Sequence, residues 1–150
     1  IFTLIGINLI DRLGRRQLMY YGSFGYIVSL SLVGCAFFLA WEGVLIPIFL
    51  FLFIASHAIG QGAVIWVFIS EIYPNHLRNT GQAFGSSIHW ILAAAIPSFV
   101  PFLFASIGAG TVFMIFAGMM VFQLLFVHFI MPETKGISLE QLSEKLSSKT

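Results

Sequence analysis

Long stretches without a charged residue dominate this sequence. The longest begin after Arg16, Glu42 and Arg78, and they contain 25, 28 and 54 residues. A helix needs about 20 apolar residues to cross the hydrocarbon core of a bilayer, so the first two stretches each accommodate one spanning helix. The third is long enough for two such helices joined by a turn, which we place at the glycine-containing segment 106–110. Such a chain is restricted to an all-α membrane architecture, because unpaired backbone groups are too costly in lipid.

Composition leads to the same class. Hydrophobic residues make up 59% of the 150 residues and charged residues only 9%, whereas a soluble domain carries roughly 25% charged residues. The formal net charge is +1 and the chain has a single cysteine, Cys35. These values exclude a soluble globular domain, a disordered chain, a nucleic-acid-binding protein and an internal disulfide framework. We expect an integral membrane protein with about four and a half transmembrane helices.

The positions of the charges also predict how the chain is organised. Residues 1–10 are too short to span a bilayer and are interpreted as the end of a truncated helix, so the sequence is expected to be a piece of a longer chain. Complete transmembrane helices are expected at 18–39, 44–70, 80–104 and 110–131. Loops are expected at 11–17 and 71–80, followed by a tail at 132–150. A capping box that begins at Ser138 and a leucine stripe predict a short amphipathic helix in that tail.

The distribution of basic residues predicts the orientation of the chain in the membrane. All seven lie in segments 11–17 and 71–80 or in the tail 132–150, and the intervening turns contain none. Loops rich in Lys and Arg face the cytoplasm, and successive loops lie on alternate sides of the bilayer. These three segments are therefore expected to be cytoplasmic in a multi-pass protein of the cell membrane.

Polar side chains within the expected spans mark candidate functional positions. Gly60-Gln61-Gly62 interrupts the apolar pattern of helix 44–70, and interrupted segments are typical of transporter binding sites. His57 lies one turn before Gln61 on the same face. His89 lies about 16 Å from Arg78 along its helix, where an ionisable group is costly and a cavity-facing role is expected. Intramembrane polar residues also join helices together, and for His57 and Gln61 this alternative stays open.

Three charged motifs carry a family resemblance. They are Asp11-Arg12-Leu13-Gly14-Arg15-Arg16, then Glu71-Ile72-Tyr73-Pro74 with Arg78, and Pro132-Glu133-Thr134-Lys135-Gly136. Their order and spacing closely resemble the C-terminal half of the sugar porter family in the major facilitator superfamily, over essentially the whole chain. The resemblance implies a twelve-helix transporter whose two six-helix halves rock about a central sugar site. The present segments would then be the end of helix 8 followed by helices 9 to 12.

The resemblance implies a gating role for several charged residues. Arg15, Glu71 and Arg78 would form part of a cytoplasmic ion-pair cluster that holds the inward gate shut, with Glu133 as a further member. Pairs at the mouth of a transporter can be dry when it is closed and hydrated when it is open, so they bias a two-state equilibrium. The alternative is that the basic residues only set the orientation in the membrane. That alternative leaves the acids Asp11 and Glu71 unexplained, because acids contribute little to topology.

The resemblance also implies a sugar site. Trp66 corresponds to a tryptophan that the family places beside the sugar, and an indole packs well on the apolar face of a pyranose. An interfacial anchor is the alternative role for Trp66, which lies close to Glu71. Trp90 corresponds to a second tryptophan, and His89 stands where relatives carry a Gln or Asn that hydrogen-bonds the sugar. With Gln61, these residues are the candidate substrate-binding set.

The predicted function is therefore the movement of a hexose, a pentose or a polyol such as inositol by alternating access, with or without proton coupling. The alternative is a major facilitator transporter of a non-sugar solute, such as an organic anion or a drug. We expect no enzyme activity, no cofactor and no metal, because the acids lie at the ends of the spans and the four histidines lack metal-ligand spacing. The expected partners are the monosaccharide, protons, the lipid bilayer and the N-terminal half of the same transporter, without nucleic acid.

Overall fold

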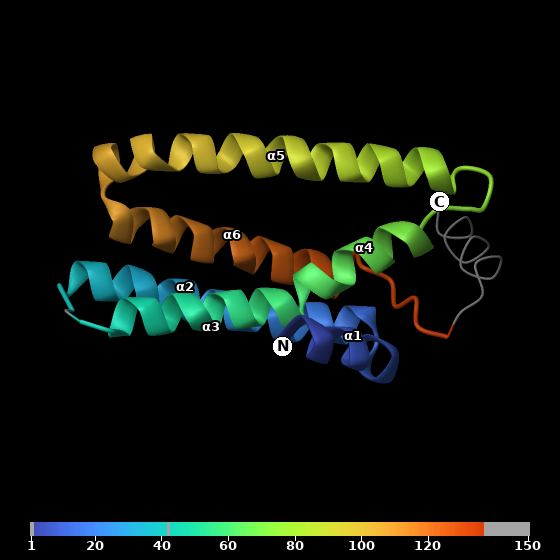
Figure 1. Ribbon diagram of the computed structural model, residues 1–150, viewed down its shortest axis with the longest axis horizontal. Helices are drawn as coiled ribbons and strands as arrows, with labels where there is room; N and C mark the ends of the chain where they lie inside the picture. The colour runs from blue at the N-terminus through green and yellow to red at the C-terminus, as the bar shows by residue number, and fades with distance from the viewer. Residues whose placement is uncertain (1, 42, 137–150) are drawn as a thin grey trace.

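Helices account for nearly all of the computed structural model, which describes residues 2–41 and 43–136. Within these ranges the chain forms six helices and no strand, so the expected all-α class is confirmed. They are α1 (Phe2–Leu13), α2 (Arg15–Phe38), α3 (Leu45–Ile59), α4 (Gln61–Glu71), α5 (Arg78–Ile107) and α6 (Ala109–Phe129) (Figure 1). Four segments of the described chain are long and apolar enough to cross a membrane: α2, α3 with α4, α5 and α6. The predicted amphipathic helix of the tail lies outside the described residues.

The expected loop at 11–17 is not present as a loop. Helix α1 continues to Leu13 and α2 begins at Arg15, so Gly14 alone separates them. Gly14 has a φ of 97°, which only glycine adopts without strain, and this permits an abrupt change of direction. The turn at 106–110 is equally short, because Gly108, with a φ of 82°, is the single residue between α5 and α6.

The span expected at 44–70 divides at Gly60 into α3 and α4. The φ and ψ angles of Gly60, −89° and −102°, lie outside the helical range. A β-carbon at Gly60 would lie 2.6 Å from the Cα atom of Gly22, so α2 and α3 cross here with their backbones almost in contact. A β-carbon at Gly25 would overlap the side chain of Ser56 on α3. Small residues permit this close crossing of membrane helices.

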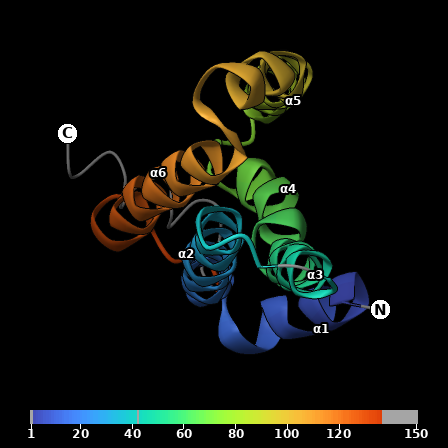
Figure 2. The ribbon, with the colours of Figure 1, turned by 90° about the vertical axis from the view of Figure 1, so that its left-hand side faces the viewer.

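Helix α2 is the centre of the bundle and packs against α3 on one side and α6 on the other (Figure 2). A cluster of buried apolar residues joins α1, α2, α4 and the end of α6 near the charged motifs, and it consists of Ile10, Leu18, Met19, Val64, Phe68, Val127 and Met131. Helix α5 stands apart from α2 and packs chiefly against α4 and α6 (Figures 1 and 2). Gly81 is the only buried residue of α5.

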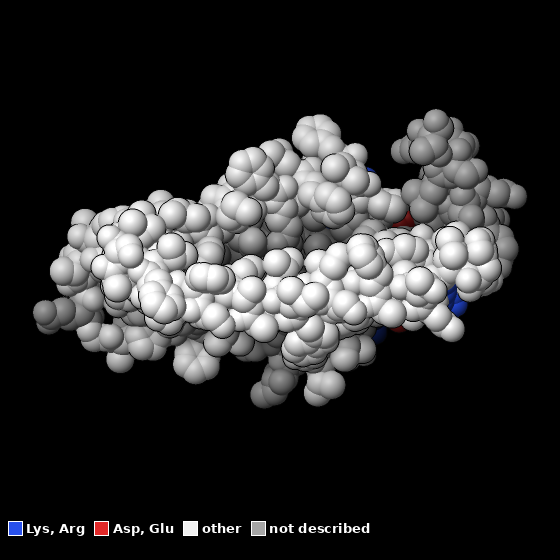
Figure 3. Space-filling model, turned by 90° about the horizontal axis from the view of Figure 1, so that it is seen from above, with Lys and Arg blue, Asp and Glu red and all other residues white. Residues whose placement is uncertain are grey.

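The face of the bundle drawn in Figure 3 is apolar along most of its length. Figure 3 shows a face without charge over most of its extent, with the visible Lys, Arg, Asp and Glu residues gathered at the end where α1 meets α4. An apolar flank with charges at its end suits a chain that lies in lipid and meets water at that end.

Candidate functional site

An aromatic cluster forms where α4 and α5 lie side by side. The ring of Trp66, on α4, lies 5.0 Å from the ring of His89 on α5 in an edge-to-face arrangement. Trp90 lies 6.3 Å from Trp66 and 5.4 Å from His89, measured between ring centroids. Trp66 is 41% exposed and Trp90 is 65% exposed, so neither side chain is covered by the rest of the described chain. Three of the four predicted substrate-binding residues are therefore neighbours.

Glycine residues on α5 bring the two helices together below this cluster. A β-carbon at Gly81 would lie 2.5 Å from the ring of Tyr73, and one at Gly85 would lie 3.4 Å from Ile69. Both glycines thus face the end of α4 and the segment that follows it. One turn beyond Gly85, this close approach places His89 against Trp66.

Gln61 lies away from the aromatic cluster. It is only 8% exposed, and its Nε2 atom donates to Ser23 Oγ on α2 at 3.2 Å. Gln123 on α6 donates to the same Ser23 oxygen at 3.3 Å. Ser23 therefore joins three helices within the membrane, as expected for a polar residue that holds helices together. Gln61 also lines an open cavity of about 820 Å³ between α2, α3, α5 and α6.

His57 also bonds to α2 rather than to the aromatic cluster. Its Nδ1 atom forms a hydrogen bond with the hydroxyl of Tyr26. Sequence reasoning did not identify Tyr26 or Ser23 as partners, because nothing along the chain indicates which face of α2 meets α3 and α6. The small-residue pattern of Gly22 and Gly25 was the available signal, since close helix crossings follow such residues.

A charged cluster lies at the opposite end of α4 from Gly60. The guanidinium of Arg15 makes two parallel bonds to Glu71, from Nη2 to Oε1 at 2.8 Å and from Nε to Oε2 at 3.1 Å. Its Nη1 atom bonds Asp11 at 3.1 Å. The side chains of Arg15 and Glu71 are 11% and 23% exposed, whereas Asp11 is 79% exposed. The partly buried, bidentate pair is therefore the strong interaction, and it ties the start of α2 to the end of α4.

Glu133 bonds the backbone at the start of α2 instead of joining the ion pairs as predicted. Its carboxylate accepts hydrogen bonds from the backbone N–H groups of Arg15 at 3.0 Å and Arg16 at 3.1 Å. These groups have no partner within α2, and a negative charge at a helix N-terminus is stabilised by the helix dipole. A β-carbon at Gly14 would lie 2.6 Å from Glu133 Oε2. Glu133 therefore caps α2 and forms no side-chain ion pair with an arginine among the described residues.

The residues after Glu133 complete this corner of the bundle. Thr134 donates from its hydroxyl to Glu71 Oε2 at 2.5 Å, and Lys135 donates from Nζ to the carbonyl of Arg12 at 2.5 Å. Sequence reasoning did not assign a role to Thr134, which is only 5% exposed. The segment after α6 thus contacts both the α1–α2 turn and the end of α4.

Arg78 does not join the ion-pair cluster in this structure. Its Nη2 atom donates to Asn75 Oδ1 at 2.7 Å, and its Nε–H is a buried donor with no hydrogen-bond partner. Within residues 2–41 and 43–136 the ion pairs are those of Arg15 alone. The predicted pairing of Arg78 is therefore not formed, because Asp11 and Glu71 are both directed to Arg15. In the same part of the chain, no three side chains of the metal-binding types come together.

Helices long and apolar enough to cross a membrane four times define a polytopic membrane protein, which here carries an aromatic cluster and a charged corner. The family described as sugar (and other) transporter matches residues 1–146. The chain belongs to this family, the sugar porters of the major facilitator superfamily, whose members are transporters and not enzymes.

Two curated relatives and one solved structure illustrate the similarity. The chain is 38% identical to an arabinose-proton symporter of Bacillus subtilis, covering 97% of this chain and 32% of the relative. It is 40% identical to the major myo-inositol transporter IolT of the same organism, and the match covers 95% of this chain and 31% of IolT. Its structure resembles that of the inward-open xylose transporter XylE of Escherichia coli, with a TM-score of 0.90 and 29% sequence identity. This match covers 96% of the present chain and 33% of XylE. The chain thus spans about a third of the length of these proteins.

Proposed function

We propose that this chain is the C-terminal part of a transporter that moves a monosaccharide or polyol across the cell membrane by alternating access. The observation that carries the proposal is the cluster of Trp66, His89 and Trp90. Relatives whose names specify arabinose and myo-inositol support this substrate class.

The chemistry of the cluster suits a sugar. Each indole offers a flat apolar face for the C–H groups of a pyranose and one N–H donor for a hydroxyl. His89 adds an imidazole that can donate to or accept from a second hydroxyl. Weak stacking with few hydrogen bonds suits a transporter, because a substrate that binds too tightly is not released. Gln61, which lines the neighbouring cavity, would contact the substrate only from that side.

The charged corner would act as part of the cytoplasmic gate. Arg15 and Glu71 hold the α1–α2 turn against the end of α4, and Glu133 and Thr134 brace the same corner. Arg78, which forms no ion pair among the described residues, would meet an acid from the N-terminal half of the transporter when the gate closes. In this proposal the segments that carry these residues face the cytoplasm, in accord with their basic character.

The test is counterflow of labelled sugars by the full-length transporter in proteoliposomes, without an ion gradient. A panel of hexoses, pentoses and polyols would identify the substrate. Trp66→Ala should reduce exchange at least about fivefold, since stacking and one hydrogen bond together contribute about 1–3 kcal/mol. Trp41→Ala is the matched control, because Trp41 lies outside the cluster against Phe49 and should leave exchange unchanged.

Two results would contradict the proposal. Equal exchange by the wild type and Trp66→Ala would remove the aromatic cluster from the binding site. Absence of exchange across the whole panel, with folded protein, would assign the transporter to a non-sugar solute. A proton gradient applied in a second experiment then distinguishes a symporter from a facilitator.

A further inference from the structure

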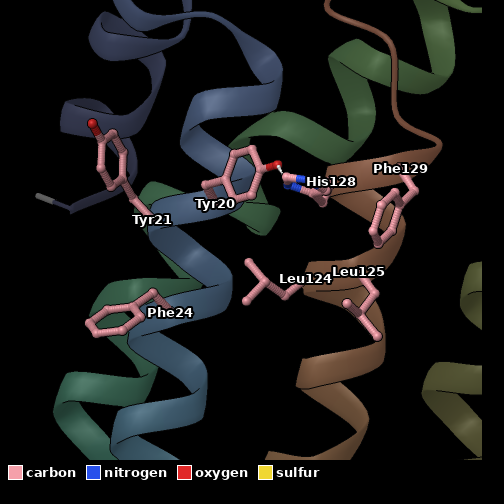
Figure 4. Close-up of a pocket in the computed structure, with 7 residues that line it drawn as sticks. All are labelled: Tyr20, Tyr21, Phe24, Leu124, Leu125, His128 and Phe129. Atoms are coloured by element: carbon pink, nitrogen blue, oxygen red, sulfur yellow. Dashed lines mark hydrogen bonds between the residues drawn. The ribbon is translucent and has the colours of Figure 1, made fainter.

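An open groove runs along the seam between α2 and α6, away from the aromatic cluster. It has a volume of about 520 Å³ and is lined by Tyr20, Tyr21, Phe24, Leu124, Leu125, His128 and Phe129. Phe24 and Phe129 are 66% and 76% exposed. Figure 4 shows the Tyr20 hydroxyl directed at His128, with Phe24, Leu124 and Leu125 further along the seam. The groove is therefore polar at one end and apolar along the rest.

The polar end continues into a basic residue. Tyr20 bonds His128 Nδ1 at 2.7 Å, and the guanidinium of Arg16 lies 5.9 Å from the centre of the Tyr20 ring. Arg16 donates to the carbonyl oxygens of Val127 and His128 at the end of α6. Among the described residues no carboxylate pairs with the Arg16 side chain, because Asp11 and Glu71 bond Arg15 and Glu133 caps α2. Arg16 thus keeps an uncompensated positive charge at the mouth of the groove.

The depth of these groups matches the structure of a phospholipid. Tyr20 and Phe24 lie about 8 and 14 Å from the first residue of α2, at 1.5 Å per helical residue. Half of the hydrocarbon core is about 15 Å thick. Arg16 consequently lies at the headgroup end of the groove, Tyr20 and its partner His128 lie below it, and the apolar lining reaches the level of the lower acyl chain at Phe24.

We infer that this groove binds an anionic glycerophospholipid, with its phosphate at Arg16, Tyr20 and His128 and one acyl chain along Phe24, Leu124 and Leu125. The occupant is a lipid rather than a free phosphate, because most of the groove is apolar and a free anion would leave that surface uncovered. It is anionic rather than zwitterionic because Arg16 carries the uncompensated charge. The site is separate from the proposed sugar site and does not depend on which solute is carried.

The test uses the full-length transporter in detergent micelles, titrated with palmitoyl-oleoyl phosphatidylglycerol or with phosphatidylcholine of the same acyl chains. Native mass spectrometry measures the affinity of the first bound lipid. Phosphatidylglycerol should bind about fivefold more tightly, the factor expected from one basic residue near the headgroup. Arg16→Gln should abolish this preference. Arg12→Gln, in α1 on the other side of Gly14, should retain it, because the guanidinium of Arg16 lies over the Tyr20 ring that lines the groove.

A second pair of variants tests the apolar half and does not depend on Arg16. Leu125→Trp fills the groove and should weaken the binding of both lipids severalfold. Phe122→Trp changes an exposed residue of α6 outside the groove and should have no effect. The inference is overturned if wild-type protein shows no preference, if Arg16→Gln keeps it, or if the two tryptophan variants bind lipid equally. The last result would also be found if another helix of the transporter, or a second copy, covered the groove.

Discussion

Replacing Glu71 by glutamine is expected to loosen the charged corner while Asp11→Asn is not. Both acids contact the same guanidinium, at 2.8 and 3.1 Å, so the two variants remove partners of one arginine. They differ in burial, because Glu71 is 23% exposed and Asp11 is 79% exposed. Glu71 also accepts from Thr134. Burial should therefore decide which of the two contributes to stability.

The magnitude follows from the bonds that each variant loses. Glutamine keeps one acceptor oxygen but loses the charge and one of the two bonds to Arg15, which corresponds to about 2 kcal/mol for a hydrogen bond between charged groups. An exposed pair such as Arg15 with Asp11 contributes about 0–1 kcal/mol. The opening of this corner should become about 30-fold more frequent in Glu71→Gln and at most about fivefold more frequent in Asp11→Asn.

Hydrogen exchange on the full-length transporter measures these openings. Backbone amides of residues 15–18 and 69–72 should exchange faster in Glu71→Gln, and those of α6 should serve as an internal reference. Equal acceleration in both variants would refute the argument from burial. No acceleration in Glu71→Gln would show that the bidentate pair does not hold the corner together.

Two further predictions concern glycines, each tested by thermal unfolding of the purified transporter. Gly14→Ala should lower the unfolding temperature more than Gly43→Ala. Both glycines have a positive φ, which costs alanine about 1–2 kcal/mol. Only Gly14 also lies against a neighbouring side chain, that of Glu133. Gly22→Ala should destabilise by about 1–3 kcal/mol through overpacking against Gly60 and Gln61. Gly118→Ala, with open space around it, should be neutral. Equal midpoints within either pair would contradict the contacts described here.

The sequence alone determined the membrane class, the four spans and the family. An uncharged stretch of spanning length is stable in a bilayer as a helix, because a helix forms all its backbone hydrogen bonds within the segment and exposes only apolar side chains to lipid. Each span can therefore be predicted from its own residues. The three charged motifs identified the sugar porter family, which the family match confirms. The grouping of Trp66 with His89 and Trp90 was implied by that resemblance, and the ring distances place the three side chains together. Their binding of a sugar stays a prediction.

Other features were decided by contacts between segments far apart in the chain. Glu133 caps α2 because the single-residue turn at Gly14 exposes two backbone N–H groups beside it, which no local pattern indicates. Gln61 turns toward Ser23 because α3 crosses α2 at Gly22, and the rotation of a helix about its axis depends on the helices around it. Arg78 forms no ion pair among the described residues, where Asp11 and Glu71 both bond Arg15. A hydrophobic stretch specifies that a helix forms, whereas the partner of each polar side chain depends on how the helices pack.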